Sequence, residues 1–559
     1  MEKIVSKKGC LIVFILSFFL ISCSKSDGNK SDISTSLSDS PVTVNITGTV
    51  EYERVPFSST HNGLDYNNIK TLPVRGAVVE VIDVDGNLVT QTATSNTGSY
   101  TVTVQQNVPV RVLVYAKSVS TDTAKWNFEV RDNTNNGGLY VMQGALANTE
   151  SSNSIRNLTA VTGWNGSSYT DTRVSAPFAI LDSAYDVAMK IVATDSNANM
   201  QEVDIFWSEK NTTASGEQSL GEIGTSYYAD NELYILGKAN IDTDEFDDHV
   251  IIHELGHYFE DNLSRSDNIG GSHSGGSILD MRVALSEGFA NAFSGMVTDD
   301  PSYRDSNGNS QSSGFEIDVE NNAVTNPGWF SESSVQSILY DIYDANIDGD
   351  DTIELGFLAI YNAMTNTNYI NQTSLTSLFS IIDELKVLNP QSSVQIDALV
   401  EAQNFSNSDI FGVDPIVDKF GSGETHSAYL ETDLPLYKTI KDDNVPVLVC
   451  SHKRSQKFNG LGTRQFLRLN INELNFYNIT VEFVPSESDI ASDDSDPDFA
   501  IFLNGNTLTT EEEAVPNIES AQATLQNNEY ILEVYEYSNI DSDVDIGGTA
   551  CFNVTVSSI

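Results

Sequence analysis

Two histidines four positions apart, His253 and His257, constrain this chain of 559 residues more than any other feature. They belong to the sequence His-Glu-Leu-Gly-His, in a stretch where Val250 and Leu255 help to form the apolar face of a helix. Positions i and i+4 of an α-helix share one face, so both imidazoles can bind one metal ion. Glu254 lies one step round the helix, within reach of a water molecule beside that ion. The pentapeptide therefore predicts a metal-binding helix that also carries a carboxylate base.

Acidic residues mark the predicted start of this helix. Asp242 is placed to cap it, and Glu245 three residues later would complete a capping box. Carboxylates in the first turns also suit the positive end of the helix dipole. Gly256, in contrast, costs about 1 kcal/mol of helix propensity relative to alanine. We expect a glycine at this position where another backbone passes close to the metal-bearing face.

A zinc ion needs more than two protein ligands, so a third must come from another part of the chain. The sequence Ser286-Glu287-Gly288-Phe289-Ala290 lies in a second predicted helix. It resembles the gluzincin metallopeptidases, the thermolysin and aminopeptidase-N clan, whose third ligand is a glutamate on the next helix. The resemblance implies a zinc site with Glu254 as general base and with three ligands, His253, His257 and Glu287. It also places Asn291 where those enzymes carry an aspartate that orients a ligand histidine.

The segment between the two helices departs from that resemblance. His257 and Glu287 are 30 positions apart, and the extra residues form the stretch Ser264–Asp280. Its four glycines and His273 predict an ordered loop over the site. A plain surface insertion is one interpretation. The functional interpretations are a substrate lid in which His273 donates a hydrogen bond to the oxyanion, and a site in which His273 is the third zinc ligand.

Two tyrosines are further candidates for the site, and one more histidine is expected to be structural. Gluzincins bring a tyrosine or histidine from later helices to the oxyanion, so the resemblance makes Tyr340 and Tyr343 candidates, with half-buried packing as the alternative. His249 shares the ligand face of its helix, and we expect it to be a half-exposed structural histidine.

The charge balance excludes one class of partner. The chain has 79 acidic and 29 basic residues, a formal charge of −50. Nucleic-acid binding needs basic surface, so no nucleic-acid partner is expected. Acidic segments raise the possibility of Ca²⁺ at Asp344–Gly349, which resembles the start of an EF-hand, and at the loop Glu487–Asp498. Leu355 replaces the bidentate glutamate of the EF-hand, so an acidic turn remains the alternative at the first of these. A solvated loop is the alternative at the second.

The N-terminus predicts export. Residues 1–22 combine lysines with an apolar core too short to span a bilayer, and end in Leu20-Ile21-Ser22 before Cys23. This resembles a bacterial lipobox, which implies cleavage before Cys23 and a lipid anchor there, with 23–40 as a flexible tether. The expected location is the cell envelope, on the outer membrane or cell surface, with a secreted protein as the alternative.

Strand patterns flank the metal-binding region. Residues 41–118 alternate like strands and resemble the transthyretin-like or carboxypeptidase-regulatory β-sandwich; a generic Ig-like sandwich is equally compatible. Residues 433–559 resemble the pre-peptidase C-terminal β-sandwich. Cys450 and Cys551 lie near its two ends, where they could form a disulfide or remain free thiols.

Residues 119–432 would form the catalytic region. A helix capped by Ser175 and two strands precede the metal-binding helix, and 227–236 is the predicted edge strand for an extended peptide. Together these patterns predict a multidomain chain with an α+β zincin-like catalytic domain flanked by N-terminal and C-terminal β-sandwich domains. The expected function is zinc-dependent hydrolysis of protein or peptide substrates by a monomer. The alternatives are a surface binding lipoprotein or adhesin with a structural or inactive zinc site, and a zinc hydrolase of another substrate class.

Overall fold

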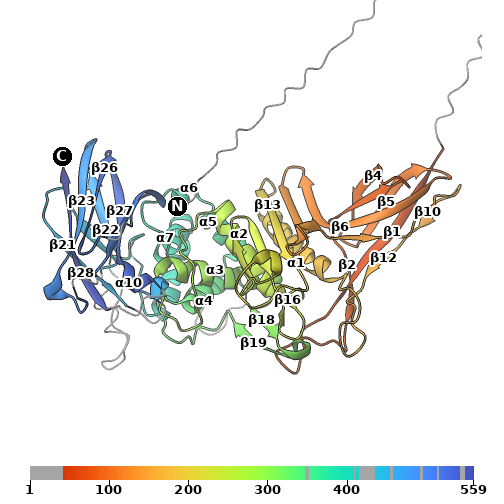
Figure 1. The fold of residues 1–559 in the computed structure, drawn as a ribbon, viewed down its shortest axis with the longest axis horizontal. Coiled ribbons are helices and arrows are strands. Elements are labelled where there is room, and N and C mark those ends of the chain that lie inside the picture. Colours follow the sequence, from red (N-terminus) through yellow and green to blue (C-terminus); the bar gives the residue numbers. More distant parts are fainter. Residues whose placement is uncertain are drawn as a thin grey trace, which may run out of the picture. The chain divides into compact units, whose positions relative to one another are not determined.

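The computed structural model describes residues 42–345, 352–407, 409–413, 435–453, 457–491, 495–512, 515–541 and 548–559 (Figure 1). The predicted signal peptide, tether and lipid site at Cys23 lie outside these residues. So do 346–351 of the EF-hand-like segment and 492–494 of the acidic loop. The described chain is rich in β-structure, arranged in five sheets among these residues.

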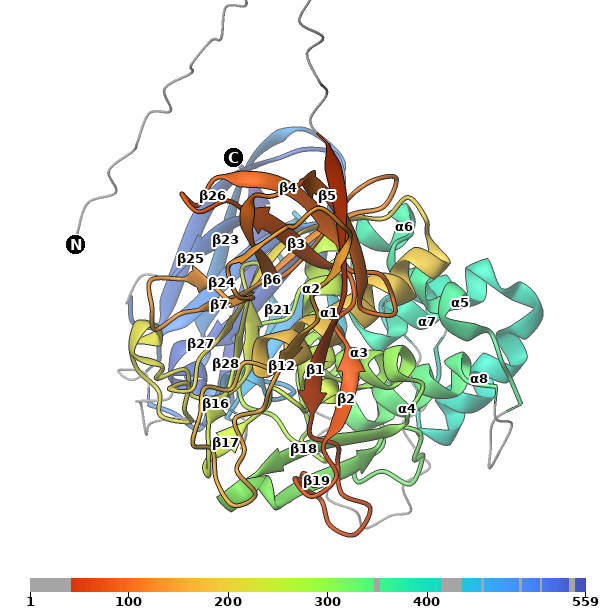
Figure 2. The same cartoon turned by 90° about the vertical axis from the view of Figure 1, so that its right-hand side faces the viewer.

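The first strands follow the predicted alternation. In β1 (Thr43–Arg54) buried residues alternate with partly exposed ones along most of the strand. It pairs antiparallel with β2 (Lys70–Pro73) and β5 (Ser99–Gln105), and parallel with β11 (Ser154–Ile155) and β12 (Leu158–Ala160). The neighbourhood of β1 and β2 can be followed in Figure 2.

One sheet crosses the predicted boundary at residue 118. Its strands lie in the order β14-β15-β13-β7-β6-β3-β4. Their bounds are β3 (Ala77–Ile82), β4 (Leu88–Ala93), β6 (Pro109–Thr121), β7 (Lys125–Asp132), β13 (Asn199–Trp207), β14 (Tyr227–Ala229) and β15 (Glu232–Ile235). Three short strands pair with its middle: β8 (Gly138–Leu139), β9 (Val141–Gln143) and β10 (Ala147–Asn148). Strands from both sides of residue 118 thus share one ladder, while the domain boundaries themselves stay predictions.

The predicted edge strand over 227–236 is a hairpin. Asp230 and Asn231 take positive φ angles of 53° and 64°, a conformation that Asp and Asn adopt more readily than most residues. The chain therefore reverses after β14 and returns as β15. Of the two hairpin strands, only β14 (Tyr227–Ala229) is an edge strand of its sheet.

Most of the helices lie in the middle of the sequence. They are α1 (Ala176–Thr194), α2 (Asp248–Leu263), α3 (Met281–Thr298), α4 (Glu332–Tyr343), α5 (Gly356–Met364), α6 (Thr367–Ile370), α7 (Leu378–Leu388) and α8 (Ser393–Ala402). Ser175 precedes α1 as predicted, although its side chain makes no capping hydrogen bond. Helix α1 packs against α2 and β7, and α3 packs against both α2 and α4.

Helix α2 begins later than predicted. Its first residue is Asp248, with Asp247 at the N-cap position, so the prediction of Asp242 as the cap is wrong. Asp242 instead belongs to β17 (Asp242–Thr243), which pairs with β16 (Gly237–Lys238) and with Asn307 of β18 (Ser302–Asn307). The neighbouring strand β19 (Ser313–Asp318) completes this small sheet. Part of the acidic run that precedes the helix therefore lies in a paired β-strand.

Two β-sheets with their own apolar core form the C-terminal region. One contains β20 (Tyr437–Ile440), β22 (Arg464–Ile471), β27 (Asn528–Glu536), β24 (Pro497–Leu503) and β25 (Asn506–Glu511). The other contains β21 (Val447–His452), β28 (Thr549–Ser558), β23 (Asn475–Phe483) and β26 (Ile518–Leu525). Cys450 and Cys551 face each other across β21 and β28 and form a disulfide, which confirms the first of the two interpretations.

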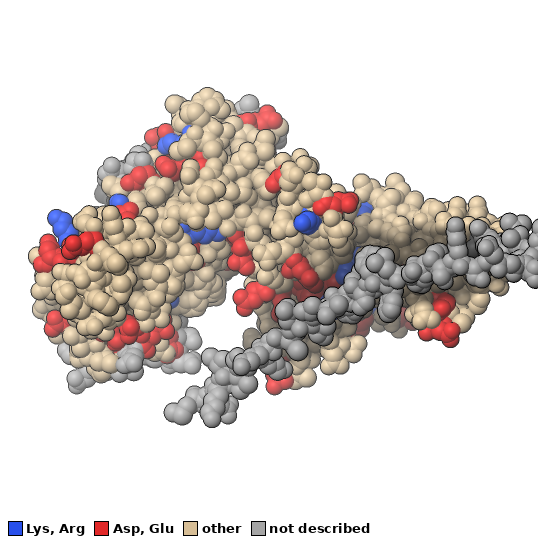
Figure 3. Space-filling model, turned by 90° about the horizontal axis from the view of Figure 1, so that it is seen from above, with Lys and Arg blue, Asp and Glu red and all other residues tan. Residues whose placement is uncertain are grey.

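Acidic side chains are spread over the face drawn in Figure 3, where basic ones are sparser. This matches the formal charge of −50. Within the described part of the chain, no helix combines the length and the apolar composition needed to cross a membrane.

The crossing of α2 and α3 leads to a prediction. A Cβ atom on Gly256 would lie 2.9 Å from Ala290 Cα, which confirms the expected close backbone approach. The variant Gly256→Ala would gain about 1 kcal/mol of helix propensity. We expect overpacking to outweigh this gain and to lower the free energy of unfolding by about 1–2 kcal/mol net. Urea denaturation measures the change.

Gly144→Ala is the control, because a Cβ there meets nothing closer than 3.4 Å. A raised unfolding midpoint for Gly256→Ala would contradict the close crossing.

Candidate metal centre

Helices α2 and α3 bring the three predicted ligands together. His253 and His257 come from α2 and Glu287 from α3, and one ligand atom from each lies within 4.8 Å of the other two. Glu287 Oε2 lies 3.3 Å from Nε2 of both histidines. Both His253 and Glu287 are buried.

The donor atoms of this cluster fit a zinc ion. Glu287 Oε2 is buried and has no hydrogen-bond partner, although an unpaired buried carboxylate oxygen is costly. Burial would raise the pKa of Glu287, but the imidazoles of His257 and His253 hold it well below its usual range. Two imidazole nitrogens and one carboxylate oxygen form a ligand set found in catalytic zinc sites. The residues present therefore suit Zn²⁺.

Asn291 orients the first ligand. Its Oδ1 lies 2.9 Å from His253 Nδ1, and its Nδ2 donates to Gln336 Oε1 at 3.0 Å. Because the amide nitrogen donates to Gln336, the amide oxygen faces His253 and accepts a hydrogen bond from its Nδ1–H. Nε2 is then left with a free lone pair toward the cluster. Asn291 thus contacts a histidine of the cluster, as its sequence position predicts.

Two residues that sequence reasoning missed hold the second ligand. Ser286 Oγ lies 3.0 Å from His257 Nδ1, and it donates to Glu260 Oε2 at 2.5 Å. Glu260 is buried, one turn after His257 on the same helix. The spacing of Glu260 and the position of Ser286 directly before Glu287 were the available signals.

Glu254 lies in the same cavity and is 8% exposed. Burial raises its pKa above the usual value, partly offset by His253 and His257. The backbone N–H of Tyr228 in β14 also lowers this pKa. Glu254 and Tyr228 therefore line the same cavity close to the histidine pair.

The cluster lies in a cavity of about 1130 Å³. The wall includes β14, the loop between α2 and α3, and residues of β18 and β19. Tyr303 of β18 is a lining residue that the sequence did not indicate; its ring centre lies 6.0 Å from that of His253.

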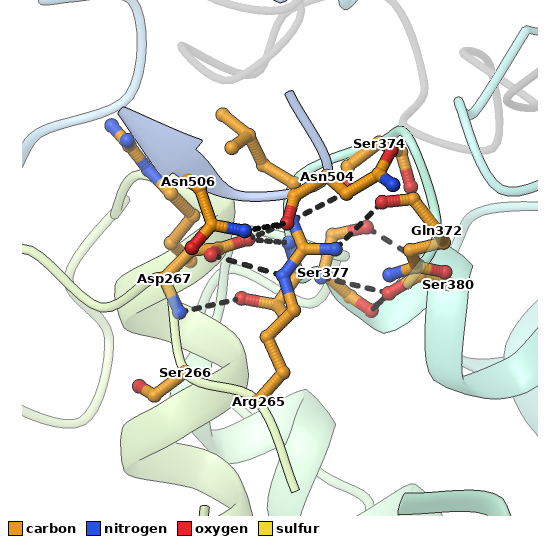
Figure 4. Close-up of polar contacts among 12 residues, drawn as sticks. Arg265, Ser266, Asp267, Gln372, Ser374, Ser377, Ser380, Asn504 and Asn506 are labelled. Atoms are coloured by element: carbon orange, nitrogen blue, oxygen red, sulfur yellow. Dashed lines mark hydrogen bonds and ion pairs between the residues drawn. The ribbon is translucent and has the colours of Figure 1, made fainter. Parts of the chain in front are cut away.

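The loop between α2 and α3 is anchored at its start by Arg265. This side chain is 8% exposed and donates to the carbonyl oxygens of Gln372 at 2.7 Å and Ser374 at 3.0 Å (Figure 4). Asp267 completes the anchor by pairing with the guanidinium at 2.7 Å and accepting the N–H of Thr376 at 2.8 Å.

The second half of the loop is held by the C-terminal region. Asn459 Nδ2 donates to the carbonyl oxygens of Gly270 and Ser272 at 3.2 and 3.1 Å, and Asn459 O accepts the N–H of Asp280 at 2.8 Å. The loop also brings Asn268 Nδ2 to within 3.3 Å of Glu287 Oε1. Asn268 was missed, because only contacts between distant segments place it there.

His273 reaches the cluster from this loop. Its Nδ1 lies 2.7 Å from Glu332 Oε2, and its Nε2 lies 3.2 Å from Glu287 Oε2. Burial opposes protonation, but the hydrogen bond to Glu332 and the charge of Glu287 raise the pKa of His273 to about 8. The structure thus brings the predicted loop histidine to the site.

The structure does not bring Tyr340 to the cavity. Glu332, at the start of α4, lines the cavity, but Tyr340 lies eight residues later, about 12 Å along the helix axis. The Tyr340 ring packs on Gly295 and Tyr343. Tyr343 also lies outside the cavity and accepts a hydrogen bond from Lys190 at 2.8 Å.

His249 is structural but more deeply buried than expected. It is 5% exposed, and its Nε2 lies 3.3 Å from Thr298 Oγ1. Burial lowers its pKa to about 4, so it is neutral near pH 7.

One family model matches the region that contains the cluster. The family model described as the Mycolysin C-terminal domain matches residues 190–380, and no curated protein matches the chain. Solved structures with similarity to 22% of the chain include the pre-peptidase C-terminal domain of collagenase from Bacillus anthracis (13% identity, 94% of that chain, TM-score 0.15). They also include the surface-associated copper-binding protein CorA of Methylomicrobium album BG8 (9%, 98%, 0.17) and the lysozyme inhibitor PliG of Aeromonas hydrophila (11%, 96%, 0.14). These TM-scores do not define a fold, whereas the family match relates the segment that carries His253, His257 and Glu287 to a domain of a peptidase family.

Proposed function

We propose that this protein is a zinc-dependent peptidase of gluzincin type. The observation that carries the proposal is the convergence of His253, His257 and Glu287 beside Glu254 in a large open cavity. The family match over 190–380 covers all four residues. The zincin-like character of the region is part of the proposal.

Glu254 acts as the proton carrier. When bound by the three ligands, zinc supplies a Lewis acid that polarises the scissile carbonyl and lowers the pKa of water. Glu254 accepts a proton from the attacking water and passes it to the leaving amine. Glu254 lies on α2 between the two histidines and lines the cavity with them, so its carboxylate is near the water for both transfers.

The edge strand supplies the binding surface for an extended substrate. Tyr227, Tyr228 and Ala229 of β14 line the cavity, and β14 lies at the end of its sheet. An edge strand offers unpaired backbone donors and acceptors to a peptide. This feature favours a peptide over the other substrate classes of zinc hydrolases.

His273 donates to the oxyanion in this proposal. The carboxylate of Glu332 orients its Nδ1, which directs Nε2 toward the cluster. The same contact with Glu287 supports the second candidate, a binding protein or adhesin whose zinc is structural. In that case His273 would be a fourth protein ligand and would close the site.

The place of action follows from the N-terminal sequence. Cleavage before Cys23 and lipidation there would hold the enzyme at the cell envelope, on the outer membrane or cell surface. Signal processing without lipidation would give a secreted enzyme.

The test of the proposal is Glu254→Gln. We expect the variant to retain zinc at one ion per chain by metal analysis. Its hydrolysis of casein or a peptide library should fall by about 10²–10⁴-fold, because the proton carrier is lost while the ligands remain.

Glu202→Gln, on the exposed part of β13, is the matched control and should keep wild-type hydrolysis. Equal cleavage by Glu254→Gln and wild type would refute the proposed role. Retained zinc with no hydrolysis by the wild-type protein would favour the structural alternative, which His273→Ala tests directly. Loss of tetrahedral four-ligand coordination in the X-ray absorption spectrum would identify His273 as a ligand.

A second prediction concerns Asn291. Asn291→Ala removes the acceptor for His253 Nδ1–H, so the affinity for zinc should fall about 10–100-fold. Asn291→Asp restores an acceptor and should keep affinity close to the wild type. Competition with a chelator measures both; equal affinities for all three proteins would contradict the orienting role.

A further inference from the structure

A second carboxylate cluster lines the same cavity, formed by Asp242, Asp244 and Asp305. One carboxylate oxygen from each lies within 4.8 Å of the other two. The pairing of Asp242 with Asn307 puts Asp244 opposite Asp305 when the register is continued. Residues two apart on a strand share a face, so Asp242 and Asp244 point to the same side. Strand geometry therefore gathers three acidic side chains at one point.

This cluster has no basic partner. Among the described residues, no ion pair joins any of its members to a lysine or arginine. Asp244 is 3% exposed; the Ser226 hydroxyl donates to its Oδ2, while its Oδ1 is buried without a partner. Oδ1 of Asp242 and of Asp305 is also buried and unpartnered. Each of the three carboxylates thus has one buried oxygen atom without a donor.

Another acidic cluster, away from this cavity wall, has its charge compensated by basic side chains. It consists of Glu129, Glu202 and Asp204, which have the same close spacing. Lys117 and Arg131 both pair with Glu129, and Arg131 also pairs with Asp204 at 2.6 Å. Charge compensation comes from the protein there. At Asp242, Asp244 and Asp305 it must come from outside the protein or from protons.

Without a cation the cluster resists full ionisation. Burial, together with the charge of Asp242, raises the pKa of Asp305 to about 7, and burial raises that of Asp242 to about 6. Like charges placed directly across a strand pair destabilise it. A shared proton between Asp242 and Asp244 would relieve part of this repulsion but would leave Asp305 about half ionised near pH 7.

The donor atoms select the kind of cation. All three side chains offer carboxylate oxygen, the ligand type preferred by Ca²⁺ and Mg²⁺ over softer metals. Two oxygens bound to one Ca²⁺ at 2.3–2.6 Å lie at most about 5 Å apart, which accommodates the observed spacing. A lone ammonium group would neutralise only one of the three charges.

We propose that Asp242, Asp244 and Asp305 bind a Ca²⁺ ion that ties β17 to β18 in the cavity wall. Tyr303 lies on the same strand two residues before Asp305, and its ring packs beside His253. The ion therefore fixes the strand that forms one side of the metal centre. This site is separate from the zinc ligands and from the EF-hand-like segment at Asp344–Gly349.

The first measurement is calcium stoichiometry by equilibrium dialysis with radioactive Ca²⁺. The parent protein is the full-length chain with bound zinc and the substitution Glu254→Gln. Because this substitution should remove the proposed peptidase activity, self-digestion does not affect the result. We expect this parent to bind one more Ca²⁺ per chain than the same protein with Asp242→Asn and Asp305→Asn. Glu202→Gln, from the ion-paired cluster, is the control and should bind as the parent does.

The second measurement is the melting temperature with and without Ca²⁺. Without Ca²⁺, the double variant should melt higher than the parent because carboxylate repulsion is relieved. With Ca²⁺, the order should reverse, because binding to the folded state stabilises only the parent. If the double variant does not fold, Asp305→Asn alone is measured in the same two ways.

Equal calcium stoichiometry in parent and variant would overturn the proposal and assign the cluster to proton sharing. A variant that loses calcium and also melts lower without it would overturn it too, since the loss would then reflect damaged folding. Stabilisation of the parent by an arginine amide but not by Ca²⁺ would instead make the cluster a subsite for a basic side chain.

Discussion

The close crossing of α2 and α3 is the contact on which the metal centre depends. Glycine at 256 lets Ala290 approach, and this approach brings Glu287 of one helix to the histidine pair of the other. The orienting contacts use the same two helices, since Asn291 and Ser286 of α3 hold the histidines of α2. A single interhelical distance therefore controls both the ligands and their orientation.

The cluster of His253, His257 and Glu287 could be predicted because its signals are local in sequence. The spacing of His253 and His257 follows from helix periodicity, and the resemblance around Glu287 indicated the third member of the cluster. The start of α2 could not be predicted from its acidic residues, because strand pairing with β18 competed with capping for Asp242. The position of Tyr340 away from the cavity could not be predicted either, because helical spacing does not tell which end of a helix reaches the cavity.

Other parts of the site depend on contacts between distant segments. Asn268 and His273 reach Glu287 only because Arg265 fixes one end of their loop and Asn459 fixes the other. Arg282 of α3 adds a buried ion pair with Glu533 of β27 at 2.8 Å. No local pattern predicts such pairs. They make the C-terminal sheets a support for the loop beside the metal centre.

The sheet that runs from β4 to β14 has a consequence for how this chain can be divided. Strands β6 and β7 pair with each other across residues 117–129, so a cut at residue 118 would separate hydrogen-bonded neighbours inside one ladder. The cut would expose the edges along which β6 and β7 now pair with each other. Unpaired strand edges promote aggregation. The N-terminal strands therefore cannot be removed or exchanged as a unit. A recombinant fragment that contains the candidate metal centre should begin upstream of β3 and include the complete sheet.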